Sequence, residues 1–258
     1  MIIYYSILIF ILGLILGSFA NVCIYRLPLK KQIIFGRSFC PKCKKKIIWY
    51  DNIPLISFIL LLGKCRKCKK EISIKYLFVE FISGISFVYL FLNYNNYLEV
   101  IFLQILVIFI LIIFFIDLKY LIIPDVLNFT LISLAMVKNF IPNFQSDFTY
   151  DINQSIIGGI VGYLIIWLII FLYKKIKNIE AMGLGDAKLM TAVGLFFGWE
   201  AVFLILFCSA ILGLISVIPS LLNKSKNIKS QIPFGPFILI SSIIYYFTGN
   251  FLIYFIII

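Results

Sequence analysis

The sequence contains no histidine and few charged residues, and each shortage excludes a class of protein. Of its 258 residues, 13% are charged and 63% are hydrophobic. A soluble domain of this length needs far more polar surface to stay in solution, so a soluble globular protein is excluded. The lack of histidine excludes hydrolases built on Ser–His–Asp or Cys–His groups and metalloproteases built on an HExxH helix. Any hydrolytic chemistry must therefore come from other side chains.

Apolar segments of membrane-spanning length, about 17 to 25 residues, recur along the whole chain. We therefore expect an all-α polytopic membrane protein with about eight transmembrane helices. The expected spans are Ile2–Cys23, Tyr76–Leu92, Leu98–Ile116, Pro124–Val137, Ser155–Tyr173, Asp186–Gly198, Ala201–Leu222 and Phe237–Ile257. The fourth and sixth are short, which indicates tilted helices or helix ends enclosed by protein.

Acidic residues are scarce, and the basic residues are unevenly placed. The chain has 23 Lys and Arg against 11 Asp and Glu, a net charge of +12. Eight alternating spans place 22 of the 23 basic residues on one side and only Lys138 on the other. Because an excess of Lys and Arg marks the cytoplasmic side, we expect both termini to face outward. Topology accounts for the positive charge, so nucleic acid is not an expected partner.

The chain divides into three expected parts. Residues 1–25 form the first span, residues 26–75 form a basic loop, and residues 76–258 form a compact helical bundle. The loop holds fourteen of the basic residues and is therefore expected on the cytoplasmic side. Its apolar segment Ile53–Gly63 is too short to cross a bilayer, and we expect it to form a small core or an interfacial hairpin.

Four of the six cysteines form two CxxC pairs in this loop. They are Cys40 with Cys43 and Cys65 with Cys68, with 21 residues between the pairs. Such pairs, embedded in Lys and Arg, are typical of a tetrahedral structural zinc site. Zinc is expected to hold together a loop too small to build its own core. The alternative, a pair of disulfides, suits the reducing cytoplasm poorly.

Three aspartates lie at the cytoplasmic ends of expected spans, where an ionisable group is costly and therefore a functional candidate. Asp117 ends the third span, Asp125 opens the fourth and Asp186 opens the sixth. One helical bundle can bring two of them together. Paired aspartates that share one proton can act as base and acid in amide hydrolysis, which the lack of histidine also favours.

Glycine and proline mark two further segments. Gly183 and Gly185 permit backbone conformations closed to other residues and the close approach of another chain, such as an extended substrate. In an apolar bundle they could instead be helix-packing residues. The segment Pro233–Pro236 is expected to be non-helical, with backbone groups available to a substrate, or to be a simple connection into the last span.

Five segments, in this order along the chain, resemble the type IV prepilin peptidases, a family of GxGD intramembrane aspartyl proteases. The segments are Gly17–Pro28, the double CxxC loop with Trp49–Pro54 between its pairs, Asp117–Asp125, Met182–Lys188 and Ile232–Phe237. The resemblance covers essentially the whole chain.

The resemblance implies a bacterial inner-membrane enzyme that cleaves the leader of type IV prepilins and pseudopilins after a glycine, on the cytoplasmic side. Asp117 and Asp186 would be its catalytic pair, and residues 76–258 its peptidase bundle. Gly183, Gly185 and Asp125 would support the active site. Asp125 could instead cap the helix that is entered through Pro124.

Bifunctional members of this family also methylate the new amino terminus with S-adenosylmethionine, and residues 26–75 resemble their methyltransferase-associated loop. No Gly-rich loop of a Rossmann unit marks a cofactor site, so this site is not assigned. Glu80, Trp49 and Tyr50 are candidates to assist the transfer. Lys75 and Leu77 depart from the arginine and proline of the family pattern, so a peptidase without methylation is one alternative.

Two other classes of protein compete with this interpretation. A proton-coupled transporter could use Asp117, Asp125 and Asp186 as a relay, although carboxylates at a single membrane face suit a relay poorly. A zinc-stabilised membrane scaffold would need no catalysis. Cleavage of a prepilin leader in vesicles distinguishes both from a peptidase.

Overall fold

The structure, a computed structural model, describes residues 1–33, 36, 38–141, 144, 152–178, 182–222 and 232–257. Regular structure within these ranges is helical, and the β pairing there is confined to two isolated bridges, Phe39 with Lys46 and Lys64 with Glu71. The predicted all-α class is confirmed. The basic loop containing Lys224, Lys226 and Lys229, and most of the loop Asn139–Asn153, lie outside the described residues.

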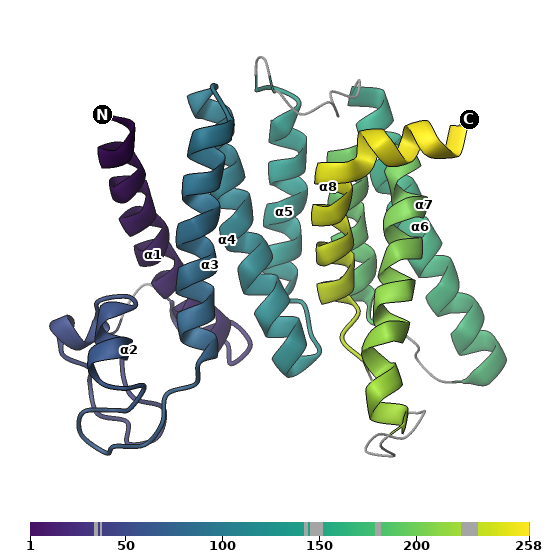
Figure 1. The fold of residues 1–258 in the computed structure, drawn as a ribbon. Helices are drawn as coiled ribbons and strands as arrows, with labels where there is room; N and C mark the ends of the chain where they lie inside the picture. The colour runs from purple at the N-terminus through teal and green to yellow at the C-terminus, as the bar shows by residue number, and fades with distance from the viewer. Residues whose placement is uncertain are drawn as a thin grey trace. The chain divides into compact units, whose positions relative to one another are not determined.

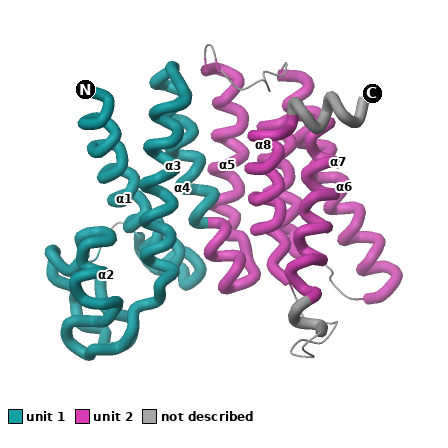
Figure 2. Tube along the Cα trace, viewed as in Figure 1, with its two compact units in different colours: residues 1–112 teal, residues 113–258 magenta. Residues whose placement is uncertain are grey.

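The chain forms two compact units, and residues 1–112 make up the first (Figure 2). Helices α1 (Ile2–Arg26) and α3 (Lys75–Asn93) pack against each other, and α4 (Tyr97–Tyr120) begins in this unit (Figure 1). Glycine permits the close packing, because a Cβ at Gly17 would lie 2.8 Å from the Cα of Glu80. The cysteine module, residues 26–75, connects α1 to α3 along the chain. It contains the short helices η1 (Trp49–Asn52) and α2 (Ile56–Leu60).

Residues 113–258 form the second unit, which α7 organises. It contains the end of α4, then α5 (Asp125–Lys138), α6 (Ile152–Lys177), α7 (Leu184–Leu222) and α8 (Gly235–Ile257). Helix α7 packs against α5, α6 and α8. Gly158 of α6 and Gly194 of α7 allow their backbones to touch, because a Cβ on either would collide with the carbonyl oxygen of the other.

Gly198 interrupts α7. Its φ of 80° and ψ of 174° are not helical, and they divide α7 into two helical segments. The sequence predicted this break between the sixth and seventh spans. Lys138, at the end of α5, is buried and donates a hydrogen bond from Nζ to the carbonyl oxygen of Phe196, two residues before the break. A cation next to the carbonyl end of a helical segment is stabilising.

Five helices within the described residues are long and apolar enough to cross a membrane: α1, α3, α4, α6 and α7. The chain is therefore a polytopic membrane protein. Helix α5 has 14 residues, and α8 has a shorter apolar stretch, Gly235–Gly249. The count of eight spans stays a prediction, because α7 joins two of the predicted spans and these two helices fall short of a full span.

Candidate active site and cysteine cluster

Asp117 lies in the last turn of α4, and its carboxylate is held at the start of α8. Its side chain is buried, and Oδ2 accepts a hydrogen bond of 3.0 Å from the backbone N–H of Gly235. A larger residue at position 235 would displace this carboxylate, because a Cβ there would lie 2.7 Å from the oxygen. The Pro233–Pro236 segment therefore has a role that the sequence did not reveal: it places Gly235 against Asp117.

Asp186 lies in the first turn of α7 and is also buried. Its backbone N–H donates to the carbonyl oxygen of Gly183 at 3.1 Å. Neither Gly183 nor Gly185 is among the residues with a positive φ, so the expectation of a backbone conformation special to glycine is wrong here. Gly185 matters through space instead, because a Cβ on it would lie 3.2 Å from the Cβ of Ile123.

The structure brings Asp117 and Asp186 together. The two carboxylates are close enough to interact electrostatically. Ile123 lies between the segments that hold the two aspartates. It contacts Gly185, which precedes Asp186, and Gly235, which binds Asp117. Two buried carboxylates from separate helices thus meet inside the second unit.

Asp125 lies apart from this pair. Its side chain is 62% exposed, and it forms an ion pair of 2.6 Å with Lys188 of α7. Helix α5 has Pro124 at its amino-terminal cap position and no hydrogen bond from a capping side chain, so the expected capping role of Asp125 is wrong. The ion pair joins the first turns of α5 and α7.

Asn128 forms a second link between the same turns, which the sequence did not predict. Its Nδ2 donates to the carbonyl oxygen of Gly185 at 3.2 Å, and its side chain is completely buried. A buried polar residue one turn after Asp125 was the available signal. Its partner, 57 residues further along the chain, could not be inferred from the sequence.

The four module cysteines form one cluster. Their sulfur atoms lie within 4.8 Å of one another, and the Sγ atoms of Cys40 and Cys68 are 3.9 Å apart. Tetrahedral zinc with Zn–S bonds of about 2.3 Å requires sulfur atoms about 3.8 Å apart, so the donor set fits a metal ion of this kind. All six cysteines are free, so disulfides do not join these pairs. The backbone N–H of Cys68 lowers the pKa of the Cys65 thiol, whereas the pKa of the Cys68 thiol is raised, in part by its hydrogen bonds with the other three cysteines.

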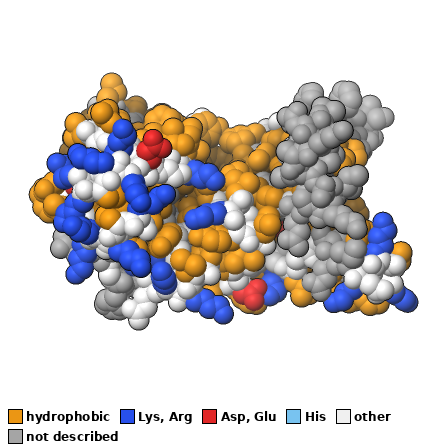
Figure 3. Space-filling model, turned by 90° about the horizontal axis from the view of Figure 1, so that it is seen from below, with side chains coloured by type: hydrophobic (Ala, Val, Ile, Leu, Met, Phe, Trp, Pro, Cys, Tyr) orange, Lys and Arg blue, Asp and Glu red, His pale blue; other side chains and the backbone are white. Residues whose placement is uncertain are grey.

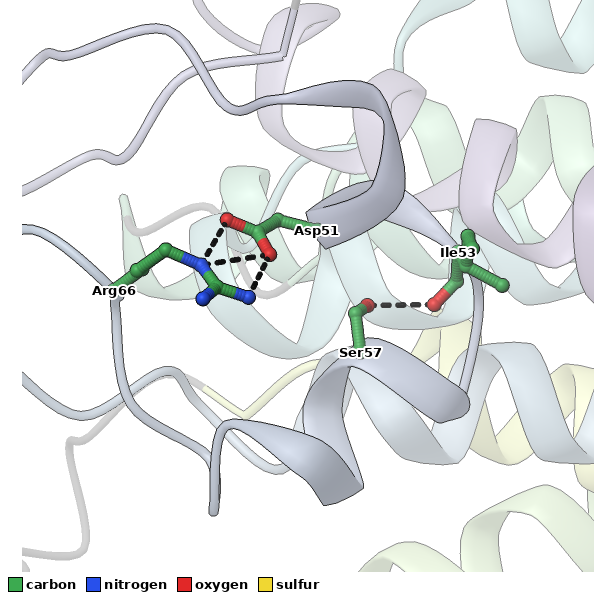
Figure 4. A network of polar contacts seen from close by, with 4 residues as sticks. All are labelled: Asp51, Ile53, Ser57 and Arg66. Carbon is green, nitrogen blue, oxygen red and sulfur yellow. Dashed lines mark hydrogen bonds and ion pairs between the residues drawn. The ribbon is translucent and has the colours of Figure 1, made fainter.

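An ion pair fastens the segment between the two CxxC pairs to the second pair. Arg66, between Cys65 and Cys68, donates to Asp51 of η1, with a shortest distance of 2.7 Å (Figure 4). Nearby, the Ser57 hydroxyl of α2 donates to the carbonyl oxygen of Ile53. These contacts give a module with few buried side chains a defined shape.

The three candidates for methyl transfer lie in two different environments. Glu80 of α3 is buried. Its carboxylate accepts a hydrogen bond of 2.9 Å from the Leu55 N–H of the module and also interacts with Ser18 of α1. Trp49 and Tyr50 are exposed and contact each other edge to face. Glu80 is thus engaged in holding the module, and no step through S-adenosylmethionine follows from these three residues.

Two family models match the chain, one in each half. Residues 11–94 match the bacterial peptidase A24 N-terminal domain, and residues 104–218 match the type IV leader peptidase family. The first match contains the cysteine cluster, and the second contains Asp117 and Asp186.

Similar proteins cover nearly the whole chain. A prepilin leader peptidase/N-methyltransferase of Vibrio cholerae is 36% identical over 252 residues, which is 95% of this chain and 97% of the relative. Proteins with the same name from Neisseria gonorrhoeae and Legionella pneumophila are 31% and 30% identical, covering 93% and 92% of this chain and 89% of each relative. No solved structure matches the chain.

Proposed function

The chain belongs to the prepilin leader peptidase/N-methyltransferase family, and from this we propose the reaction that its buried aspartates carry out. It is an aspartyl endopeptidase of the bacterial inner membrane that cleaves the leader of type IV prepilins and pseudopilins after a glycine. Cleavage takes place on the cytoplasmic side, and both termini of the chain face outward. The basic loops and the positive-inside rule support this orientation.

The observation that supports the proposal most is the meeting of Asp117 and Asp186. Both are buried, they come from different helices, and they interact electrostatically. A transporter relay would need carboxylates along a path, and the exposed Asp125 paired with Lys188 does not extend this pair into one. A scaffold would have no need for two buried, adjacent carboxylates, which are costly to keep.

The pair hydrolyses the peptide bond by sharing one proton. The ionised carboxylate removes a proton from water, and the water oxygen bonds to the carbonyl carbon after glycine. The protonated partner gives its proton to the carbonyl oxygen. When the tetrahedral intermediate collapses, the C–N bond breaks, the nitrogen takes up the proton held by the pair, and one hydroxyl of the intermediate returns its proton to the pair as the carboxylic product forms. The two groups titrate as a unit, so neither is assigned the base alone.

The family match also supports methylation of the new amino terminus, for which S-adenosylmethionine would supply the methyl group. The metal in the cysteine cluster is zinc, held by Cys40, Cys43, Cys65 and Cys68. Four thiolates and no histidine favour zinc, and the clustered sulfur atoms support the assignment. Bound there, zinc has a structural role, since four protein ligands leave no open position.

The test of the catalytic pair is leader cleavage by two single variants. Asp117→Asn and Asp186→Asn, each reconstituted with a prepilin in vesicles, should lose about 1000-fold or more in cleavage rate, because each removes a proton-transfer group. The change in substrate mass measures cleavage. Thermal unfolding in detergent checks that each variant is folded.

Glu200→Gln is the matched control. Glu200 is an exposed carboxylate on α7, the same helix as Asp186, beyond the Gly198 break. This variant should cleave at the wild-type rate. Substantial cleavage by either aspartate variant would refute the pair, and a wild-type protein that cleaves no prepilin would refute the proposed function as a whole.

A further inference from the structure

The cysteine module has an apolar face that points away from its own core. Ile56, Ile59 and Leu60 of α2 are 55%, 64% and 75% exposed, and Leu62 just after it is 83% exposed. Phe58 points the other way and packs on Gly63, where a Cβ would lie 3.1 Å from its ring. Four large aliphatic side chains are thus directed outward from a part of the chain that lies between two membrane-spanning helices.

The peptide before α2 is held near the second turn of α3. The Leu55 N–H, immediately before α2, donates to Glu80, which is five residues after the start of α3. At 1.5 Å per residue, this is about 7.5 Å along the helix axis. The segment just before α2 therefore folds back against α3.

The backbone around α2 keeps this face turned outward. Leu55 and Leu62, which flank the helix, both have positive φ, at 59° and 49°. Leucine avoids this region, so the surrounding contacts must hold both turns. The hydrogen bonds from the Leu55 N–H to Glu80 and from the Gly63 N–H to the Phe58 carbonyl oxygen do so.

The apolar face belongs to a strongly basic part of the chain. Residues 26–75 contain fourteen Lys and Arg and two acidic residues, Asp51 and Glu71. Exposed basic side chains of the second CxxC segment, which directly follows Leu62 in the chain, include Lys64, Lys67, Lys69 and Lys70. Figure 3 shows Lys and Arg side chains gathered over this end of the molecule, with hydrophobic side chains beside them.

We propose that Ile56, Ile59, Leu60 and Leu62 form a membrane-docking face, which lies in the headgroup region of the bilayer while the lysines of the second CxxC segment bind anionic lipid headgroups. Interfacial helices place their apolar side about 5 to 10 Å into the headgroup and acyl boundary, and the hydrogen bond to Glu80 keeps α2 close to the end of a membrane-spanning helix. Basic residues near a surface gain further affinity from anionic lipid. The module therefore lies on the membrane and does not extend freely into the cytoplasm. This proposal does not depend on the peptidase reaction.

Photo-crosslinking of the full-length protein in lipid nanodiscs tests the docking face. The photoreactive residue p-benzoylphenylalanine is placed at position 60 or, as the control, at position 45, where the exposed Lys45 lies in the first CxxC segment. Lipid adducts detected by mass spectrometry should be at least about fivefold more abundant from position 60. Trypsin cleavage within the module should be several-fold slower in discs with phosphatidylglycerol than in pure phosphatidylcholine, and salt should reduce this difference.

Three outcomes would overturn the proposal. The first is equal lipid labelling from positions 60 and 45. The second is labelling from position 60 that goes to a co-reconstituted prepilin in place of lipid, which would make the apolar face a substrate surface. The third is trypsin cleavage at the same rate in both lipids, which would show that the module does not bind anionic headgroups.

Discussion

Asn128 connects the peptide before Asp186 to α5 at the cost of an unsatisfied oxygen. Its Nδ2 donates to Gly185, while its buried Oδ1 has no hydrogen-bond partner in the described structure. A buried acceptor without a partner costs about 1–3 kcal/mol, and a hydrogen bond contributes about 1 kcal/mol, so the residue brings little net stability. Its contribution is to hold the peptide that precedes Asp186.

Asn128→Leu should therefore separate activity from stability. Leucine has a similar size but no hydrogen bond, so the Gly185–Asp186 peptide loses its link to α5. We expect kcat for leader cleavage to fall about 10- to 100-fold, since small displacements of reacting groups have effects of this size. The free energy of unfolding should change by less than about 1 kcal/mol. Thermal unfolding and turnover, measured in the same detergent, report the two quantities.

Thr130→Val is the control for this variant. The Thr130 hydroxyl donates to the carbonyl oxygen of Leu127 within its own helix, so valine removes a hydrogen bond of α5 without touching α7. Its turnover should stay within about twofold of wild type. Wild-type turnover per folded molecule in Asn128→Leu would show that this residue does not position the site.

The sequence predicts only those site residues that belong to a local motif. Asp117 and Asp186 each stand beside recognisable segments, and both were proposed from the sequence. The partners Gly235 and Asn128 were not, because their hydrogen bonds join positions 118 and 57 residues apart. A motif records which residue types a site needs, but the contact between two motifs depends on how the helices pack.

At the scale of helices, the contact between α6 and α7 depends on glycine. A Cβ at Gly158 would collide with the Gly194 carbonyl oxygen. Gly158→Ala should force the helices apart and reduce the free energy of unfolding by about 1–3 kcal/mol, as overpacking does. The midpoint of thermal unfolding in detergent measures the loss.

Gly213→Ala, in the same helix α7, is the matched comparison. A Cβ at Gly213 would lie 3.7 Å from the nearest atom of Phe237, an ordinary contact. Because alanine favours a helix over glycine by up to about 1 kcal/mol, this variant should be as stable as wild type or more stable. Equal destabilisation by the two substitutions would show that the close α6–α7 approach does not limit stability.

The sequence predicts where the helices lie better than it predicts how many of them cross the membrane. The break at Gly198 was visible because two apolar stretches meet around Gly198–Glu200, and its positive φ confirms the break. The shortness of α5 was also visible. Hydropathy alone could not show that α7 packs against α5, α6 and α8, because these helices are apolar on all sides and their sequences do not indicate which face contacts a neighbour.

At the scale of the whole molecule, the two units divide the proposed chemistry. The cysteine cluster lies in residues 1–112, while Asp117, Asp186 and Gly235 all lie in residues 113–258. The functional division at residue 76 stays a prediction. Because Asp117 and Asp186 have their contacts within the second unit, we expect leader cleavage to survive damage to the cysteine module.

The double variant Cys40→Ser with Cys43→Ser tests this independence. It should lose the bound zinc, measured by elemental analysis, and with it methylation of the mature pilin, measured by mass spectrometry, because the module needs its metal to fold. Leader cleavage should stay within about twofold of wild type, as expected for sites without shared partners. Cys208→Ser, a free cysteine of α7 outside the cluster, should keep both zinc and methylation. Loss of cleavage together with zinc would instead mean that the cysteine module, not the second unit alone, holds the catalytic pair in place.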